Sequence, residues 1–171
     1  MNAAALIDRL AHGPAMIEAA LRGVGPAEFR WKPAPDAWSL VEIVNHLCDE
    51  ETLDFRTRVD LTLHRPGDPW PPIDPVGWAT VRDYQSRDLE ESLTRFRRLR
   101  EESLVFLRSL AAPDWSRVHE HPKIGRLRAG DLLASWAAHD LLHLRQIAKR
   151  RYEYGVAVLG EGYAAEYAGG W

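Results

Sequence analysis

Cysteine is almost absent from this chain, which contains a single one, Cys48, among 171 residues. A lone cysteine excludes an intramolecular disulfide, so a disulfide framework has no part in this fold. Because Cys48 lies in a segment with helical periodicity, we interpret it as a small buried hydrophobic residue rather than a nucleophile.

Long hydrophobic runs are also missing from the sequence. No stretch approaches the roughly 20 apolar residues that span a bilayer. The first residues lack the positive start, apolar run and small-residue cleavage site of a secretory signal. We therefore expect a cytoplasmic protein that does not bind a membrane.

A surplus of basic charge is absent as well, since the formal net charge is -3 and the isoelectric point is about 6.2. Proteins that bind nucleic acid by neutralising phosphates usually carry a basic surplus, so we expect no nucleic-acid partner. The basic cluster of Arg97, Arg98 and Arg100 is interpreted as a solvated helix face. Without internal repeats, 171 residues of which 46% are hydrophobic fit one domain over residues 1–171.

Hydrophobic residues recur at helical intervals in four segments, and this pattern predicts an all-α fold, a four-helix bundle. The expected helices cover about residues 2–22, 39–63, 79–111 and 130–152. In the first of these, Gly13-Pro14 predicts a kink or a restart. The proline-rich segment 65–77 is long enough, when extended, to cross the whole bundle. A long crossover of this kind leaves the second and third helices parallel.

Three connecting segments have other patterns. The alternation and central glycine of residues 117–128 predict a short hairpin or an extended loop. The linker before the second helix carries Trp31 and Trp38, which could close one end of the bundle. Residues 154–171 mix glycine, alanine and aromatic residues. We interpret them as a tail that packs on the body or on a second subunit.

Histidine is the residue type that points to chemistry. His139 and His143 are four residues apart in a predicted helix, which places both imidazoles on one face, where they can share a divalent ion. A third ligand is best sought at His46, about two turns into the helix that a capping box of Ser39 and Glu42 begins. The helical pattern lets all three histidines face one interior. For the His139 and His143 pair alone, core or surface histidines are an equal alternative.

Other polar and aromatic residues near these positions have two interpretations each. Glu50 and Asp54 fall on the inward face of the second helix, where they could orient a ligand histidine or accept a proton, or could line a solvent groove. His119 and His121 are interpreted as surface histidines of a loop, with a substrate or extra metal contact as the alternative. Trp136 is interpreted as core packing or as a pocket wall.

Two segments together resemble the DinB-like superfamily of metal-binding four-helix bundles. Residues 36–47, Asp-Ala-Trp-Ser-Leu-Val-Glu-Ile-Val-Asn-His-Leu, resemble its Trp-Ser entry to the second helix. Residues 128–147 resemble its fourth-helix pattern, which ends in His-x3-His and Gln-Ile. The resemblance covers nearly the whole chain and matches the long crossover. It implies a metal triad of His46, His139 and His143.

This superfamily includes the bacillithiol transferases and the mycothiol-dependent maleylpyruvate isomerases. The resemblance therefore implies a divalent ion, Zn²⁺ or Ni²⁺ above all, with an open position for water or substrate. It further implies a thiol S-transferase that uses a low-molecular-weight thiol of the bacillithiol, mycothiol or glutathione type. Arg145 or Arg126 could then hold a carboxylate of the small-molecule substrate. By family analogy we also expect a homodimer.

Three alternatives to the transferase stay open. A metal-dependent hydrolase would use the same three histidines with water as the nucleophile. A metal-binding stress-response or interaction protein would have no turnover, and a closed fourth ligand would favour it. A bundle that binds no metal predicts that His46 points away from His139 and His143. The sequence identifies neither the metal nor the substrate.

Overall fold

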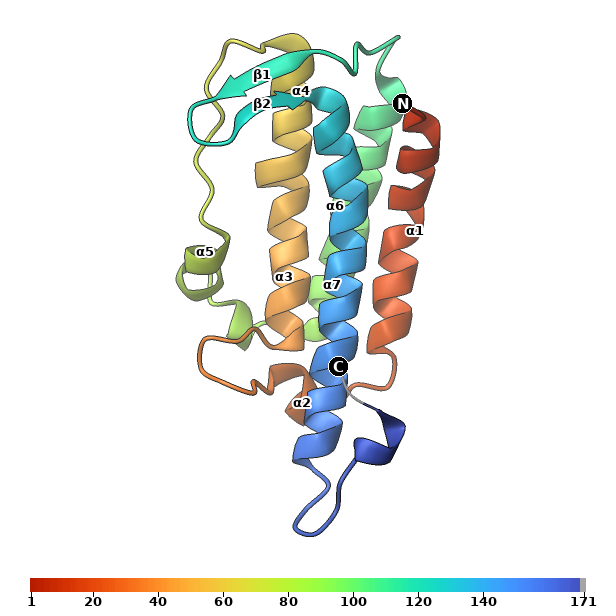
Figure 1. Cartoon of the computed structure of the whole chain (residues 1–171), viewed down its shortest axis with the longest axis vertical. Coiled ribbons are helices and arrows are strands. Elements are labelled where there is room, and N and C mark those ends of the chain that lie inside the picture. The colour runs from red at the N-terminus through yellow and green to blue at the C-terminus, as the bar shows by residue number, and fades with distance from the viewer. Residues whose placement is uncertain (170–171) are drawn as a thin grey trace.

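Four long helical segments pack side by side in the computed structural model, which describes residues 1–169 (Figure 1). The first is α1 (Ala3–Leu21) and the last is α7 (Ala129–Ala157). The second consists of α3 (Leu40–Asp49), a π-helical turn η1 (Glu50–Phe55) and α4 (Arg56–His64), which follow one another without a break. The third is α6 (Leu89–Ser109). The prediction of an all-α four-helix bundle is confirmed.

Side-chain caps determine where two of these helices begin. Ser39 and Glu42 form the predicted capping box of α3, in which the backbone N–H of Ser39 donates to Glu42 Oε2 over 2.8 Å. Asp88 caps α6 by accepting from the backbone N–H of Glu91 over 3.0 Å. The expected start of the third helix at residue 79 is therefore wrong. That region instead holds the short α5 (Pro75–Val81) and the 3₁₀ turn η2 (Tyr84–Ser86), separated by Asp83 with a positive φ of 48°.

The connection between α4 and α6 is the predicted long crossover. It runs along the outside of the bundle from the end of α4 back to the level where α3 begins (Figure 1). Parallel packing of α3 and α6 follows from their contacts, because Asn45 Nδ2 donates to Ser92 Oγ over 2.9 Å and Glu51 accepts from Arg100 further along both helices.

Asp49, a buried residue of α3, holds the crossover in place. Its carboxylate accepts from Arg82 and Arg95, each over 2.9 Å, and from the hydroxyl of Tyr84. Arg82 and Tyr84 belong to the end of the crossover, whereas Arg95 belongs to α6. One carboxylate therefore joins α3 to both.

The remaining connections agree with the sequence pattern only in part. Residues 118–128 form the predicted hairpin, in which β1 (Val118–His121) pairs antiparallel with β2 (Gly125–Arg128). The last helix extends beyond the expected residue 152 to Ala157, so it takes up the beginning of the expected tail. The tail then continues through turns and η3 (Glu166–Ala168), and most of its side chains are exposed. Residues 170 and 171 lie outside the described residues. Within residues 1–169, no helix has the length and apolar character needed to cross a membrane.

A layer of polar side chains divides the hydrophobic core into two halves. Each long helix contributes apolar residues to both halves, for example Leu10 and Ile17 of α1 or Leu104 and Leu99 of α6. At the boundary between the halves the four helices carry polar or small residues instead. These residues are Gly13 of α1, Glu51 of η1, Arg100 of α6 and Asp140 of α7. The polar layer is continuous with the three histidines described below.

The predicted alternative of a restart at Gly13-Pro14 is wrong, because α1 is one continuous helix in which Pro14 is internal. A Cβ atom at Gly13 would lie 2.1 Å from Asp140 Oδ2 and 2.6 Å from Arg100 Nη1. The glycine therefore marks a close approach of α1 to the polar layer.

Gly13→Ala is expected to destabilise the protein by about 1–3 kcal/mol, the usual cost of overpacking a core. Gly155 of α7 offers a matched control, because it is also helical and a Cβ there would meet nothing within 4 Å. Gly155→Ala is expected to stabilise the protein by about 0.5–1 kcal/mol through helix propensity. Urea denaturation of both variants measures the difference, and equal effects of the two substitutions would contradict the close packing at Gly13.

Candidate metal centre

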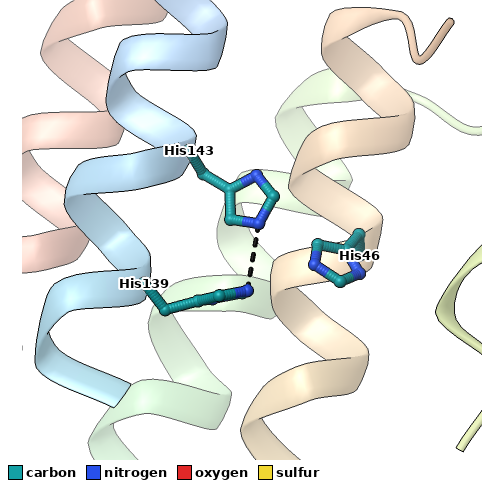
Figure 2. A group of neighbouring side chains, drawn as sticks. All are labelled: His46, His139 and His143. Carbon is teal, nitrogen blue, oxygen red and sulfur yellow. Dashed lines mark hydrogen bonds between the residues drawn. The ribbon is translucent and has the colours of Figure 1, made fainter. Parts of the chain in front are cut away.

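His46 of α3 and the pair His139 and His143 of α7 face one another across the gap between the two helices (Figure 2). The ring centroid of His46 lies 5.3 Å from that of His139 and 4.7 Å from that of His143. One nitrogen of each ring can be chosen so that the three atoms lie within 4.8 Å of one another. His46 thus points toward the pair, in contrast to the expectation for a bundle that binds no metal.

The spacing of these nitrogens fits a single divalent ion. The Nε2 atoms of His139 and His143 are 3.1 Å apart, and two imidazoles on one tetrahedral Zn²⁺ have nitrogens about 3.3 Å apart, given bonds of about 2.0–2.1 Å. The Nδ1 atom of His46 is buried and has no hydrogen-bond partner. Neutral imidazole nitrogens at this spacing are a donor set that Zn²⁺ and similar divalent ions accept.

Burial keeps the three rings neutral, which is the form that binds metals. Desolvation, followed by the neighbouring His143, lowers the pKa of His46 to about 2. The same two causes lower the pKa of His139 to about 3, and desolvation also lowers the pKa of His143.

Gln146, one turn beyond His143, determines which nitrogen of that ring carries the proton. With the amide oriented as it is here, Gln146 Oε1 accepts from Nδ1 of His143 over 2.7 Å. The Nε2 atom of neutral His143 therefore keeps its lone pair, and His139 Nε2 is the donor of the contact between the two rings. His139 would offer its Nε2 lone pair in the same way in the tautomer that carries the proton on Nδ1.

Two aromatic side chains enclose the histidines. Trp38 lies 4.7 Å from His46 and stacks on His143 at 6.5 Å, measured between ring centroids. Phe55 contacts His139 edge-on, at 5.1 Å between ring centroids. Trp136 packs behind Phe55, almost fully buried, and donates from its indole N–H to Glu51 Oε1 over 2.8 Å. Trp136 is thus a core residue, and Trp38 and Phe55 are the aromatic side chains that contact the histidines directly.

Glu50 and Asp54 lie on the inward side of the π-helical turn and are both buried, so the alternative of an open solvent groove is wrong for them. Glu50 Oε1 is 3.7 Å from His46 Nδ1. Burial, followed by the charge of Asp54, raises the pKa of Glu50 to about 8. Burial also raises the pKa of Asp54, against the opposing charge of Arg58, whose Nε lies 2.5 Å from Asp54 Oδ1. Such π-turns are rare and often mark functional sites.

A cleft of about 680 Å³ opens at His139 and His143. The other residues of its lining also come from α7 and are Leu142, Arg145, Gln146 and Lys149. Of the two arginines expected to hold a carboxylate, Arg145 is in this lining. Arg126 lies on the hairpin and pairs with Glu120 over 3.0 Å.

The other candidate residues lie outside this group. His119 is buried on the hairpin, where it stacks on Trp70 with 4.2 Å between ring centroids, so its interpretation as a surface histidine is wrong. His121 accepts from the backbone N–H groups of Lys123 and Ile124. Cys48 is buried as predicted, and burial raises the pKa of its thiol to about 12, which leaves it un-ionised at neutral pH.

The sequence of this chain matches the family model of the DinB superfamily over residues 9–147. The chain belongs to the DinB superfamily. Among solved structures, it is similar to YfiT from Bacillus subtilis, which was described as a probable metal-dependent hydrolase with an unusual four-helix bundle topology. The two chains are 21% identical, with a TM-score of 0.79 over 90% of this chain and 87% of YfiT. This similarity shows the DinB fold. A comparison with curated proteins found no match.

The roles of several residues around His46, His139 and His143 were not predicted from the sequence. Trp38 was expected at the end of the bundle, although its position in the Trp-Ser motif is a signal that places it two residues before the first residue of the helix that carries His46. Gln146 could have been found from its helical spacing to His143. For Arg100 the prediction of a solvated face is wrong, because only 1% of its surface is exposed. Arg97 and Arg98 do form an exposed face.

Proposed function

We propose that this DinB protein binds one divalent metal ion, Zn²⁺ or Ni²⁺, through His46, His139 and His143, and that it is a metal-dependent enzyme. The observation that supports this most strongly is the convergence of three neutral imidazoles from two helices, two of which, His139 and His143, line a cleft. Within residues 1–169, that group contains three histidines and no fourth ligand. Three protein ligands and an open position are typical of a catalytic site rather than a structural one.

The chain's own residues would orient the ligands and shape the site. Gln146 holds the His143 ring with its Nε2 lone pair toward the centre, and Glu50 lies beside Nδ1 of His46. Trp38 and Phe55 limit the access of water. A bound divalent ion supplies Lewis acidity, which favours the ionised form of a thiol or of water at neutral pH.

The reaction we favour is the transfer of a low-molecular-weight thiol to an electrophilic small molecule. The cleft supports this choice, because Arg145 and Lys149 give its wall positive charge and Leu142 gives it an apolar patch. A thiol that carries a carboxylate, as glutathione does, would place that group near Arg145. Its sulfur could then reach His139 and His143, which line the same cleft.

A metal-dependent hydrolase is the second candidate, and the description of YfiT as a probable hydrolase favours it. The same three histidines and the same cleft would serve both reactions. An assay of the metal-loaded protein with an activated ester and with a thiol plus a chloro-nitrobenzene electrophile separates them. Turnover of neither substrate class would favour the third candidate, a metal-binding stress-response or interaction protein.

Metal content is the measurement that tests the proposed centre. Protein purified without a polyhistidine tag and reconstituted with Zn²⁺ is expected to hold about one ion per chain, and His143→Ala is expected to lose it. His12→Ala is the control, because His12 is an exposed residue of α1. Elemental mass spectrometry after desalting gives the stoichiometry. Equal zinc content in the wild type and in His143→Ala would place the ion elsewhere.

A further inference from the structure

Arg100 uses all five of its N–H groups although it is buried inside the bundle. Its guanidinium donates to Glu51 Oε1 from Nε over 2.9 Å and from Nη2 over 2.5 Å. It donates to Asp140 from Nη1 over 2.6 Å and from Nη2 over 2.9 Å. The fifth N–H goes to the backbone oxygen of Leu10 over 2.7 Å. A side chain with no free donor is fixed in one orientation.

These acceptors belong to the three other long segments of the bundle. Leu10 is in α1, Glu51 is in η1 and Asp140 is in α7, so one side chain of α6 contacts them all. Asp140 directly follows His139 in the chain, and Glu51 directly follows Glu50 in the helix that carries His46. Arg100 therefore connects the backbone that carries His46 to the backbone that carries His139 and His143.

The Gly13-Pro14 pair of α1 completes the arrangement. Proline has no N–H, so Pro14 cannot donate to the carbonyl of Leu10, which is its partner position in an α-helix. That free carbonyl is the one that accepts from Arg100. Gly13 supplies the space, since any Cβ there would collide with Asp140 and Arg100. The otherwise unfavourable Gly-Pro pair inside a helix is thus explained by this one guanidinium.

We propose that Arg100 is a positioning residue for the metal centre, which sets the separation of His46 from His139 and His143 by holding Glu51 and Asp140. The proposal rests on the metal site proposed above. Arg100 donates its hydrogen bonds to Glu51, Asp140 and Leu10 and not to the histidines, so it positions the three rings through the helices. Its charge also adds to the desolvation that lowers the pKa of His139. A ligand set split over two helices depends on the distance between them, and a packed polar layer gives that distance one value.

Two conservative variants test the proposal. Arg100→Lys keeps the charge, but one ammonium group cannot serve two carboxylates and a carbonyl with the geometry of a guanidinium. Asp140→Asn keeps the shape and removes one charge. The control is Asp49→Asn, because Asp49 is equally buried and also bound by two arginines, yet it joins α3 to α6 and the crossover rather than to α7. Circular dichroism first establishes that each variant is folded.

The readouts are the Zn²⁺ dissociation constant, from competition with a chromophoric chelator, and the visible spectrum of the Co²⁺-substituted protein, which reports ligand geometry. Arg100→Lys and Asp140→Asn are expected to weaken Zn²⁺ binding about tenfold or more and to change the Co²⁺ spectrum. Metal affinity falls by such factors when the residues that orient the ligands are replaced. Asp49→Asn is expected to be less stable than the wild type but to keep the wild-type dissociation constant for Zn²⁺. If Arg100→Lys does not fold, the Zn²⁺ dissociation constant and the Co²⁺ spectrum of Asp140→Asn test the proposal.

Wild-type Zn²⁺ affinity and an unchanged Co²⁺ spectrum in both variants would overturn the role of Arg100 and leave the proposed metal centre intact. A wild-type protein that binds no Zn²⁺ would instead overturn the metal centre, and this inference with it. A loss of affinity in Asp49→Asn as large as in Asp140→Asn would show that general loosening of the bundle explains the effect, which also overturns the positioning role.

Discussion

Arg100→Met is expected to lower the free energy of unfolding by about 3–5 kcal/mol, the usual cost of removing one partner from a buried ion pair. Methionine fills much of the space but leaves Glu51 and Asp140 as two buried carboxylates without a cation. It also leaves the carbonyl of Leu10 without a donor, since Pro14 offers none. Urea denaturation followed by circular dichroism measures the change, provided that the slope m stays constant.

Arg98→Met is the matched control for this substitution. Arg98 lies two residues earlier in α6 and is an exposed partner of Glu102. Exposed ion pairs of this kind contribute little, so we expect a change within about 0.5 kcal/mol. If Arg98→Met and Arg100→Met destabilised the protein equally, the buried network would not have the importance that its geometry indicates.

Zn²⁺ binding is expected to stabilise the protein by about 4 kcal/mol when free Zn²⁺ is about 1,000 times the dissociation constant. For a chain of this length, that corresponds to a rise in the melting temperature of about 10 °C. His46→Ala is expected to abolish the rise, because it removes the only one of the three ligands that α3 contributes. Differential scanning calorimetry with and without Zn²⁺, and after addition of a chelator, measures the effect.

His64→Ala controls for the loss of a histidine as such. His64 is an exposed residue at the end of α4, where it contacts Asp60. Zn²⁺ is expected to raise the melting temperature of this variant as much as that of the wild type. An undiminished rise in His46→Ala would mean that the stabilising ion binds at a different place on the protein.

The histidine group was predictable because its determinants are local. Four-residue spacing places His139 and His143 on one side of any helix, whatever surrounds it. The capping box of Ser39 and Glu42 locates the start of the second helix and so the side on which His46 lies. The bundle topology followed from the periodicity of apolar residues and from the length of the proline-rich crossover. Both features depend on neighbouring residues in the chain.

The polar layer was not predictable because its determinants are distant in the chain. Arg100 is separated from Glu51 by 49 residues and from Asp140 by 40. Beside Arg97 and Arg98, its charge indicates a solvated face, and only the packing of all four helices makes burial favourable. Glu50 and Asp54 were expected on the inward face, but the π-helical turn, in which Glu51 is buried as well, has no local sequence signature. Gly13-Pro14 was interpreted by its backbone preferences, whereas the fold uses its missing N–H and missing side chain.

The dependence of Gly13 and Pro14 on Arg100 has an evolutionary consequence. A relative that lost the arginine would keep a proline that exposes a carbonyl and a glycine that leaves a hole, both without benefit. A relative that replaced the glycine first would have no room for the arginine. Substitutions at positions 13, 14, 51, 100 and 140 are therefore expected to be inherited together. The absence of the Gly-Pro pair in a distant homologue would then mark a lineage that organises the interior of its bundle differently.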